Sequence, residues 1–136
     1  MPTVDEWNRA QDDAKQSNTF ARSGAQAAIL INGGAATAIL ARPNSLVDIA
    51  HGPFPAVAIA LYAVGVSLGA IAFPEASKSV EQYMMAWQTD GRDRKHYHDR
   101  GDRLWKRTLG LIYSSLACFT FASVMLAFAI LRAGIH

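Results

Sequence analysis

The sequence predicts an all-α integral membrane protein with three transmembrane helices and helical extensions on the cytoplasmic side. Three uncharged stretches carry this prediction: residues 23–41, 54–73 and 108–131. At 1.5 Å per residue of helix, each is long enough to cross the roughly 30 Å of hydrocarbon in a bilayer. The charged residues, which make up 18% of the chain, lie almost entirely before and between these stretches. A water-soluble helical domain would scatter its charges around every helix, so this segregation favours a membrane protein.

Residues 1–22 are predicted to form a polar cytoplasmic helix. Thr3 and Glu6 have the spacing of a capping box, in which the threonine hydroxyl accepts a hydrogen bond from the backbone N–H of Glu6. No proline or glycine follows until Gly24, so we expect a helix that starts near Val4 and runs unbroken into the first span. The acidic residues near the N-terminus are unlike a basic leader segment, and we expect no signal peptide.

The first span, residues 23–41, has an unusually small and polar centre. Small residues let transmembrane helices approach closely, so a stripe of them predicts a packing face. The predicted face combines residues four apart with a neighbouring glycine: Gly24, Ala28, Asn32, Ala36 and Gly33. Asn32 is the only amide near the centre of a span. It either lines a pore, bonds an asparagine of a neighbouring subunit, or bonds a backbone carbonyl of another helix in the same chain, and we favour the last.

Residues 42–53 are predicted to form an external loop, because Pro43, Gly52 and Pro53 all disfavour helix. The second span follows at 54–73. It contains a GxxxG pair, Gly65 and Gly69, which predicts close helix packing. Pro74 comes directly after the span, where it would either kink the helix or begin a new one.

Residues 74–107 are predicted to form a cytoplasmic helical hairpin. Its first arm has apolar residues at helical spacing, its turn lies at 89–92, and its second arm is weakened by Gly101. The third span is 108–131. Gly110 and Ser114 are predicted to belong to its packing face, and Trp105 precedes it at the depth where aromatic belts form.

The distribution of basic residues predicts the orientation. Of the 13 lysines and arginines, all but Arg42 and Arg132 lie in 1–22 or 74–107. The positive-inside rule therefore places the N-terminus and the hairpin in the cytoplasm and the C-terminus outside. We therefore expect a multi-pass membrane protein.

The second arm of the hairpin is a candidate site for anionic lipid headgroups or a phosphorylated ligand. It concentrates seven cations: Arg92, Arg94, Lys95, Arg100, Arg103, Lys106 and Arg107. We favour a different interpretation, in which this arm is a solvated segment that fixes the orientation of the protein in the membrane. Membrane lipids are expected partners, whereas a net charge of +2 does not indicate nucleic acid.

Catalytic and metal-binding patterns are weak in this sequence. His96 and His98 are two residues apart and would face different ways on a helix, so we expect no metal site. Cys118 is expected to be a packing residue, and Glu75 a solvated carboxylate at the membrane boundary. Without a nucleophile–base set, a phosphate loop or a zinc motif, we expect neither an enzyme nor a cofactor.

Two segments, Ile31–Leu40 (INGGAATAIL) and Val57–Tyr83, carry a resemblance. With the polar N-terminal helix and the charged hairpin, they resemble small bacterial inner-membrane proteins with three spans. The resemblance implies a location in that membrane, and it implies no activity and no site residue.

Three functions follow as hypotheses. The first is a non-enzymatic protein that acts by assembly, as a homo-oligomer or as an accessory subunit of a membrane complex. The second is an oligomeric pore, ion channel or membrane-permeabilising effector. The third is a lipid- or ligand-sensing module. No acidic or basic residue lies at the centre of a span, which argues against proton relays and voltage sensors.

Overall fold

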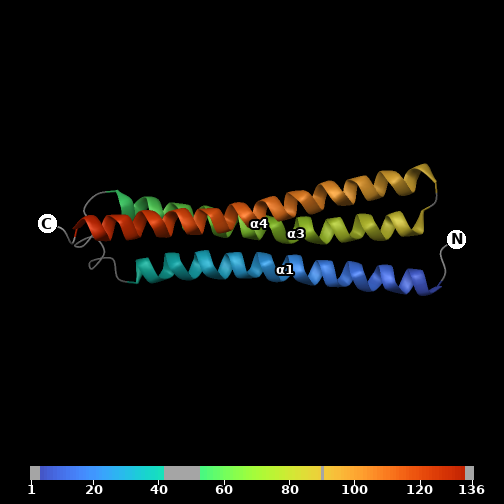
Figure 1. Cartoon of the computed structure of the whole chain (residues 1–136), viewed down its shortest axis with the longest axis horizontal. Helices are drawn as coiled ribbons and strands as arrows, with labels where there is room; N and C mark the ends of the chain where they lie inside the picture. Colours follow the sequence, from blue (N-terminus) through green and yellow to red (C-terminus); the bar gives the residue numbers. More distant parts are fainter. Residues whose placement is uncertain (1–3, 42–52, 90, 134–136) are drawn as a thin grey trace.

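The computed structural model describes residues 4–41, 53–89 and 91–133. Within these ranges the chain forms three helices: α1 (Val4–Leu40), α3 (Phe54–Gln88) and α4 (Arg92–Ala133). They form one elongated bundle (Figure 1). The all-α prediction is confirmed, and so is a first helix that starts at Val4 and continues through the first span. The predicted capping residue Thr3 and nearly all of the predicted external loop 42–53 lie outside the described residues.

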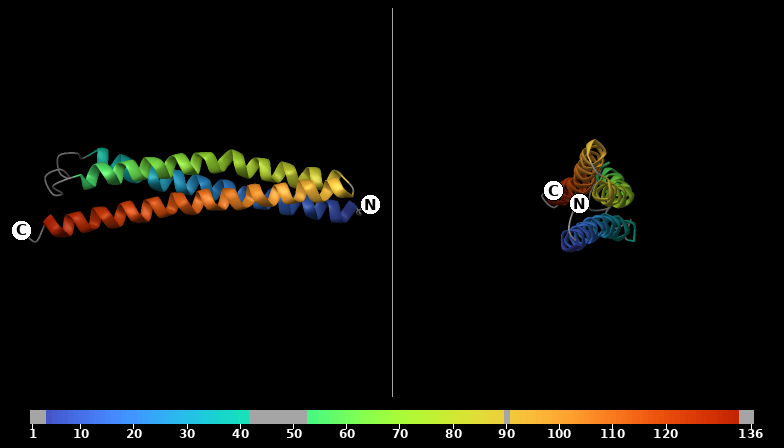
Figure 2. Two further views of the ribbon diagram at one scale, coloured as in Figure 1. Left: turned by 90° about the horizontal axis from the view of Figure 1, so that it is seen from above. Right: turned by 90° about the vertical axis from the view of Figure 1, so that its right-hand side faces the viewer.

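The two ends of the bundle differ in which segments they contain. The beginning of α1 lies at the same end as the turn between α3 and α4 (Figure 1). The end of α1, the beginning of α3 and the end of α4 lie together at the opposite end. Helices α3 and α4 form an antiparallel hairpin, and α1 lies alongside it (Figure 2). This arrangement matches the alternating direction that three consecutive spans require.

All three helices are long and apolar enough to cross a membrane. They contain 37, 35 and 42 residues, which corresponds to lengths of about 55, 52 and 63 Å. A bilayer's hydrocarbon core is only about 30 Å thick. Each helix therefore has enough length to cross the core and to continue well beyond it, as part of the same bundle.

Two residues that the sequence suggested as interruptions lie inside continuous helices. Pro74 does not begin a new helix, because α3 continues through it to Gln88. Instead α3 bows along its length (Figure 2). Gly101 lies within α4, buried against the ring of Tyr83. The predicted turn is confirmed, and it contains Gly91 with φ at 72°, a left-handed conformation that glycine adopts without strain.

The buried seam between the helices repeats with an average step of 3.5 residues. Along each helix, successive buried residues are three, four or seven positions apart, the spacing of a left-handed coiled coil. Most of them are small, which lets the helices approach closely. The seam comprises Ala21, Ala25, Ala28, Asn32 and Ile39 of α1, Pro55, Ala58, Tyr62, Gly65, Gly69, Ala72, Ala76, Ser79 and Ala86 of α3, and Gly101, Thr108, Ile112, Ser115, Ala122 and Ala129 of α4.

Large apolar side chains point outward from the bundle. Leu30 is 73% exposed, Phe121 is 61% exposed and Phe128 is 60% exposed. Among the side chains that the structure describes, the largest fully buried ones are instead polar: Asn32, Thr108, Ser79 and Ser115. In a water-soluble bundle the large apolar residues would occupy the interior. This distribution is therefore inverted relative to that of a water-soluble protein.

Candidate functional site

Asn32 joins the three helices at the level of the predicted spans. Its amide nitrogen donates to the Ala28 carbonyl at 2.9 Å, within α1. The same nitrogen lies 3.1 Å from the Ser115 hydroxyl oxygen and 3.3 Å from the Ser115 carbonyl, both on α4. The Ser115 hydroxyl in turn donates to the Gly65 carbonyl of α3 at 2.7 Å. One chain of hydrogen bonds thus runs across the seam, entirely within a single polypeptide.

Two glycines of α3 allow this close approach. A β-carbon at Gly65 would lie 2.5 Å from Cγ of Asn32 and 2.8 Å from its amide nitrogen. A β-carbon at Gly69 would lie 2.9 Å from Ile29 Cγ1 and 3.3 Å from the Ala25 carbonyl oxygen. Neither site has room for a side chain, so α1 packs directly against the backbone of α3 at both positions.

The other predicted packing residues are distributed between the seam and the surface. Ala28 is buried in the seam, whereas Gly24, Gly33 and Ala36 are half-buried at its edges. Gly110 and Ser114 lie on the exposed face of α4, and a β-carbon at Gly110 would meet nothing within 4 Å.

The seam of α4 is instead made by residues that the sequence analysis did not single out for packing. Ile112 and Ser115 are buried there. Farther along, Tyr62 of α3 shares a hydrogen bond of 3.0 Å with Ser123 of α4. Their helical spacing could have indicated a shared face, but nothing in the sequence indicates which partner each residue meets.

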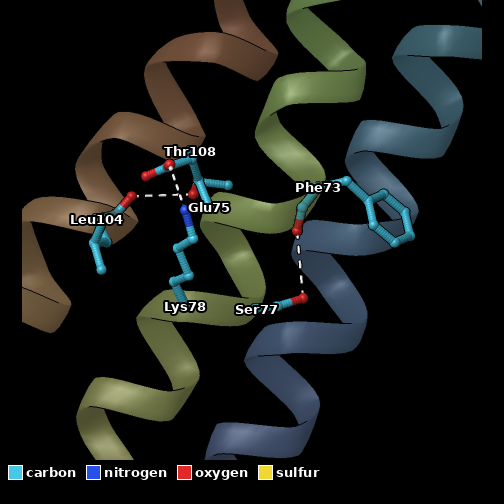
Figure 3. A network of polar contacts seen from close by, with 6 residues as sticks. All are labelled: Phe73, Glu75, Ser77, Lys78, Leu104 and Thr108. Carbon is cyan, nitrogen blue, oxygen red and sulfur yellow. Dashed lines mark hydrogen bonds and ion pairs between the residues drawn. The ribbon is translucent and has the colours of Figure 1, made fainter.

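Glu75 lies on α3 just beyond the predicted second span. It forms an ion pair with Lys78 at 3.6 Å, and the pair is partly exposed. Its other carboxylate oxygen is buried without a hydrogen-bond partner among the described residues. Figure 3 shows the Glu75 side chain extending from α3 toward Thr108 of α4. The Thr108 hydroxyl donates to the Leu104 carbonyl of its own helix at 3.0 Å. Glu75 is therefore less solvated than the sequence suggested.

A cavity of about 430 Å³ lies between the three helices at the end that contains the α3–α4 turn. Most of its lining is apolar or aromatic. It is lined by Ala14, Ser17, Ser79, Val80, Tyr83, Ala86, Trp87, Arg94, His98 and Trp105. Ser79 is not available to a ligand as a donor, because its hydroxyl already donates to the Gly101 carbonyl at 2.9 Å.

Tyr83 is held in place at one wall of this cavity. Its hydroxyl donates to Asp102 Oδ1 at 2.6 Å, and its ring packs edge-on against His98 with the centroids 5.4 Å apart. Nδ1 of His98 lies 3.7 Å from the second carboxylate oxygen of Asp102. Burial of the phenol raises the pKa of Tyr83 above its ordinary value, and the hydrogen bond to the Asp102 carboxylate raises it further.

The seven predicted lipid- or ligand-binding cations are all exposed on α4. Of these, Arg94 also lines the large cavity, where its guanidinium lies 5.0 Å from the centre of the Trp87 ring. That distance is within the range of a cation–π interaction. Within the described part of the chain, no group of three or more histidine, cysteine or acidic side chains is arranged to hold a metal ion.

Comparisons with known proteins add no relatives to this description. No protein-family model matches the sequence, and neither a curated protein nor a solved structure matches the chain. The assignment of function therefore rests on the geometry of the seam, the outer surface and the cavity.

Proposed function

We propose that this chain is a non-enzymatic, multi-pass protein of a bacterial inner membrane that acts by assembly. The observation that carries the membrane part is the inverted distribution of side chains, with polar and small residues inside and large apolar residues outside. The exposed hydroxyls of Thr37, Ser67 and Thr120 fit the same environment, because each donates to a carbonyl one turn earlier in its own helix. A hydroxyl satisfied in this way can face lipid at little cost.

The proposed orientation places the N-terminus and the α3–α4 turn in the cytoplasm. These two segments lie at the same end of the bundle, and 11 of the 13 lysines and arginines belong to 1–22 and 74–107. The positive-inside rule favours this end as the cytoplasmic one. The spans would then be 23–41, 54–73 and 108–131.

Single cysteines and a membrane-impermeant maleimide test the orientation, in a Cys118→Ser background. Lys95→Cys should react only after the cells are permeabilised. Ala41→Cys, at the opposite end of α1, should react in intact cells. Labelling of Lys95→Cys but not of Ala41→Cys in intact cells would reverse the orientation, and recovery of the protein in the soluble fraction of disrupted cells would overturn insertion itself.

The outer face of α3 supports self-assembly. It carries small exposed residues spaced four and three apart, on the side of the helix nearly opposite Gly65 and Gly69: Ala56, Ala60, Ala63, Ser67 and Ala70. The buried face of α3 uses the same spacing against α1. In a bilayer, apolar helix surfaces gain little free energy by leaving the surrounding hydrocarbon. Close approach at small residues therefore contributes much of the stability of helix pairs. We infer that the partner is a second copy, which would pair α3 with α3 about a twofold axis.

Cross-linking tests this interface. In the Cys118→Ser background, Ala63→Cys should give a disulfide-linked dimer in membranes, while Ala117→Cys on the exposed face of α4 should give much less. Ala63→Leu should shift the purified protein toward monomer in native mass spectrometry. A wild-type protein that is monomeric in mild detergent, with no partner co-purifying, would contradict assembly.

A further inference from the structure

The aromatic cavity lies outside the predicted spans, and the assembly proposed above does not use it. All three helices contribute to it, and its volume of about 430 Å³ is in the range of small-molecule sites. Among the described residues, α1 contributes Ala14 and Ser17 to the lining, α3 contributes the indole of Trp87 and α4 contributes that of Trp105. Small side chains on one helix and large aromatic side chains on the other two therefore line the same cavity.

The walls favour a flat apolar body. Trp87, Trp105 and Tyr83 offer ring surfaces, and Ala86 adds a small apolar patch on α3. Aromatic rings interact favourably with one another in offset or edge-to-face arrangements, beyond the gain from burial. The hydrogen bond from Tyr83 to Asp102 and the packing of Gly101 under the Tyr83 ring fix the orientation of one wall.

The charge in the cavity favours an anion. Among the described groups that line it, Arg94 is the one permanently charged side chain. No carboxylate is among the described residues that line the cavity. Asp102 lies behind one wall, where it accepts from Tyr83 on one oxygen and lies beside His98 on the other. The guanidinium of Arg94 stacks over Trp87 and still has N–H donors in its plane. A ligand seated against Trp87 would therefore have a cation beside it.

We propose that this cavity binds a water-soluble organic anion with an aromatic body. The body would lie between Trp87, Trp105 and Tyr83, and the anionic group would accept hydrogen bonds from Arg94. That the ligand comes from water and not from the bilayer rests on the spans proposed above. Arg94 precedes the third span by fourteen residues of helix, about 21 Å, whereas the headgroup layer extends only roughly 5–8 Å beyond the hydrocarbon. A lipid anchored in the bilayer would not bring its headgroup to Arg94.

Calorimetric titration of the purified full-length protein, dispersed in an uncharged detergent, tests the proposal. The probe is naphthalenesulfonate, and the neutral naphthalenesulfonamide is its matched analogue. The sulfonate should bind saturably and more tightly than the sulfonamide. It should also change the tryptophan fluorescence, because Trp87 and Trp105 line the cavity.

Three variants separate the contributions of charge and shape. Arg94→Gln should weaken sulfonate binding about ten-fold and leave sulfonamide binding unchanged, because it removes a charge-assisted hydrogen bond. Arg103→Gln, which changes the net charge equally on the same helix outside the cavity, should leave both unchanged. Ala14→Leu should weaken binding of both compounds by filling the cavity from α1, and its circular dichroism should show an intact bundle.

Several outcomes would overturn the proposal. Absence of saturable binding to the wild type is one, and equal losses in Arg94→Gln and Arg103→Gln are another. A stoichiometric lipid that co-purifies with the wild type and is lost in Ala14→Leu would assign the cavity to lipid instead. These measurements depend neither on orientation nor on subunit number, so a failure here is distinguishable from a failure of the membrane or assembly proposals.

Discussion

The side-chain amide of Asn32 lies against the α-carbon of Gly65, on the side where any other residue would carry its β-carbon. The carbonyl oxygen of that amide is buried and accepts no conventional hydrogen bond among the described residues. It faces the Cα–H of Gly65 instead, a weak donor of the kind that recurs where transmembrane helices approach closely. Asn32, at the polar centre of the first predicted span, and Gly65, the first glycine of the GxxxG pair in the second, are therefore two halves of one contact.

Gly65→Ala should destabilise the bundle strongly. Its β-carbon would overlap the Asn32 amide, which is buried and has nowhere to move. Overpacking of this kind typically costs about 1–3 kcal/mol, measured as a lower midpoint of SDS-induced unfolding followed by circular dichroism. Gly110→Ala is the matched control, because its β-carbon would meet nothing within 4 Å. Its midpoint should stay unchanged or rise, and equal losses in the two variants would refute the close contact.

Asn32 and Ser115 should be energetically coupled. Asn32→Ala removes the donor to the Ser115 hydroxyl, and Ser115→Ala removes both that acceptor and the donor to the Gly65 carbonyl. In a double-mutant cycle the two losses should be less than additive, with a coupling of about 0.6–1.7 kcal/mol, as for hydrogen bonds between membrane helices. Additive losses would show that the two side chains act independently. Thr120→Ala, at an exposed hydroxyl bonded within its own helix, is a suitable control.

Tyr83 should ionise at higher pH than an ordinary tyrosine. Its pKa is raised above 10.0 by burial and by the Asp102 carboxylate. An acid whose pKa is higher in the folded state gives stability that is complete below the unfolded value and is lost as pH rises through the folded value. The wild type should therefore lose stability above about pH 10, and Tyr83→Phe should lose less. Ultraviolet titration of the phenolates in both proteins, alongside their unfolding midpoints, checks this.

Backbone conformation alone should determine which residues are tolerated at position 91. Its φ of 72° is left-handed, and a β-carbon there would meet no atom within 4 Å. Gly91→Ala should therefore cost about 1 kcal/mol, and Gly91→Asn should cost less, because asparagine tolerates this region better. A larger loss for asparagine than for alanine, measured by the same unfolding assay, would mean that something other than backbone strain limits this turn.

Much of the fold could be predicted from the sequence, because the charge and hydropathy of a segment depend on that segment alone. The uncharged stretches and the run without proline or glycine before Gly24 were sufficient to place the helices. The register of the seam was harder to predict. A stripe of residues four apart, such as Gly24, Ala28 and Asn32, advances about 40° around the helix at each step. It therefore leaves the contact face, whereas the observed seam alternates steps of four and three.

The cavity could not have been predicted from the sequence. Its described walls come from three helices, with Ala14 of α1, Trp87 of α3 and Trp105 of α4 in the same lining. The helical spacing of apolar residues predicted a packing face on the first arm of the hairpin, but not which residues of α1 would lie near it. Similarly, Ser115 was one small residue among several in the third predicted span, and only the packing of α4 against α1 and α3 distinguishes it from Ser114.

The glycines and alanines of the seam also determine which substitutions the chain can tolerate. A position that already holds the smallest side chain can change only toward larger ones, whereas an outward-facing leucine or phenylalanine can be exchanged among apolar residues of similar volume. A saturation-mutagenesis scan should therefore show sensitivity that rises and falls along each helix with a seven-residue rhythm. The sensitive positions would mark the seam, and the rhythm would persist on both sides of the proposed membrane boundary, because the seam continues along the bundle beyond the predicted spans.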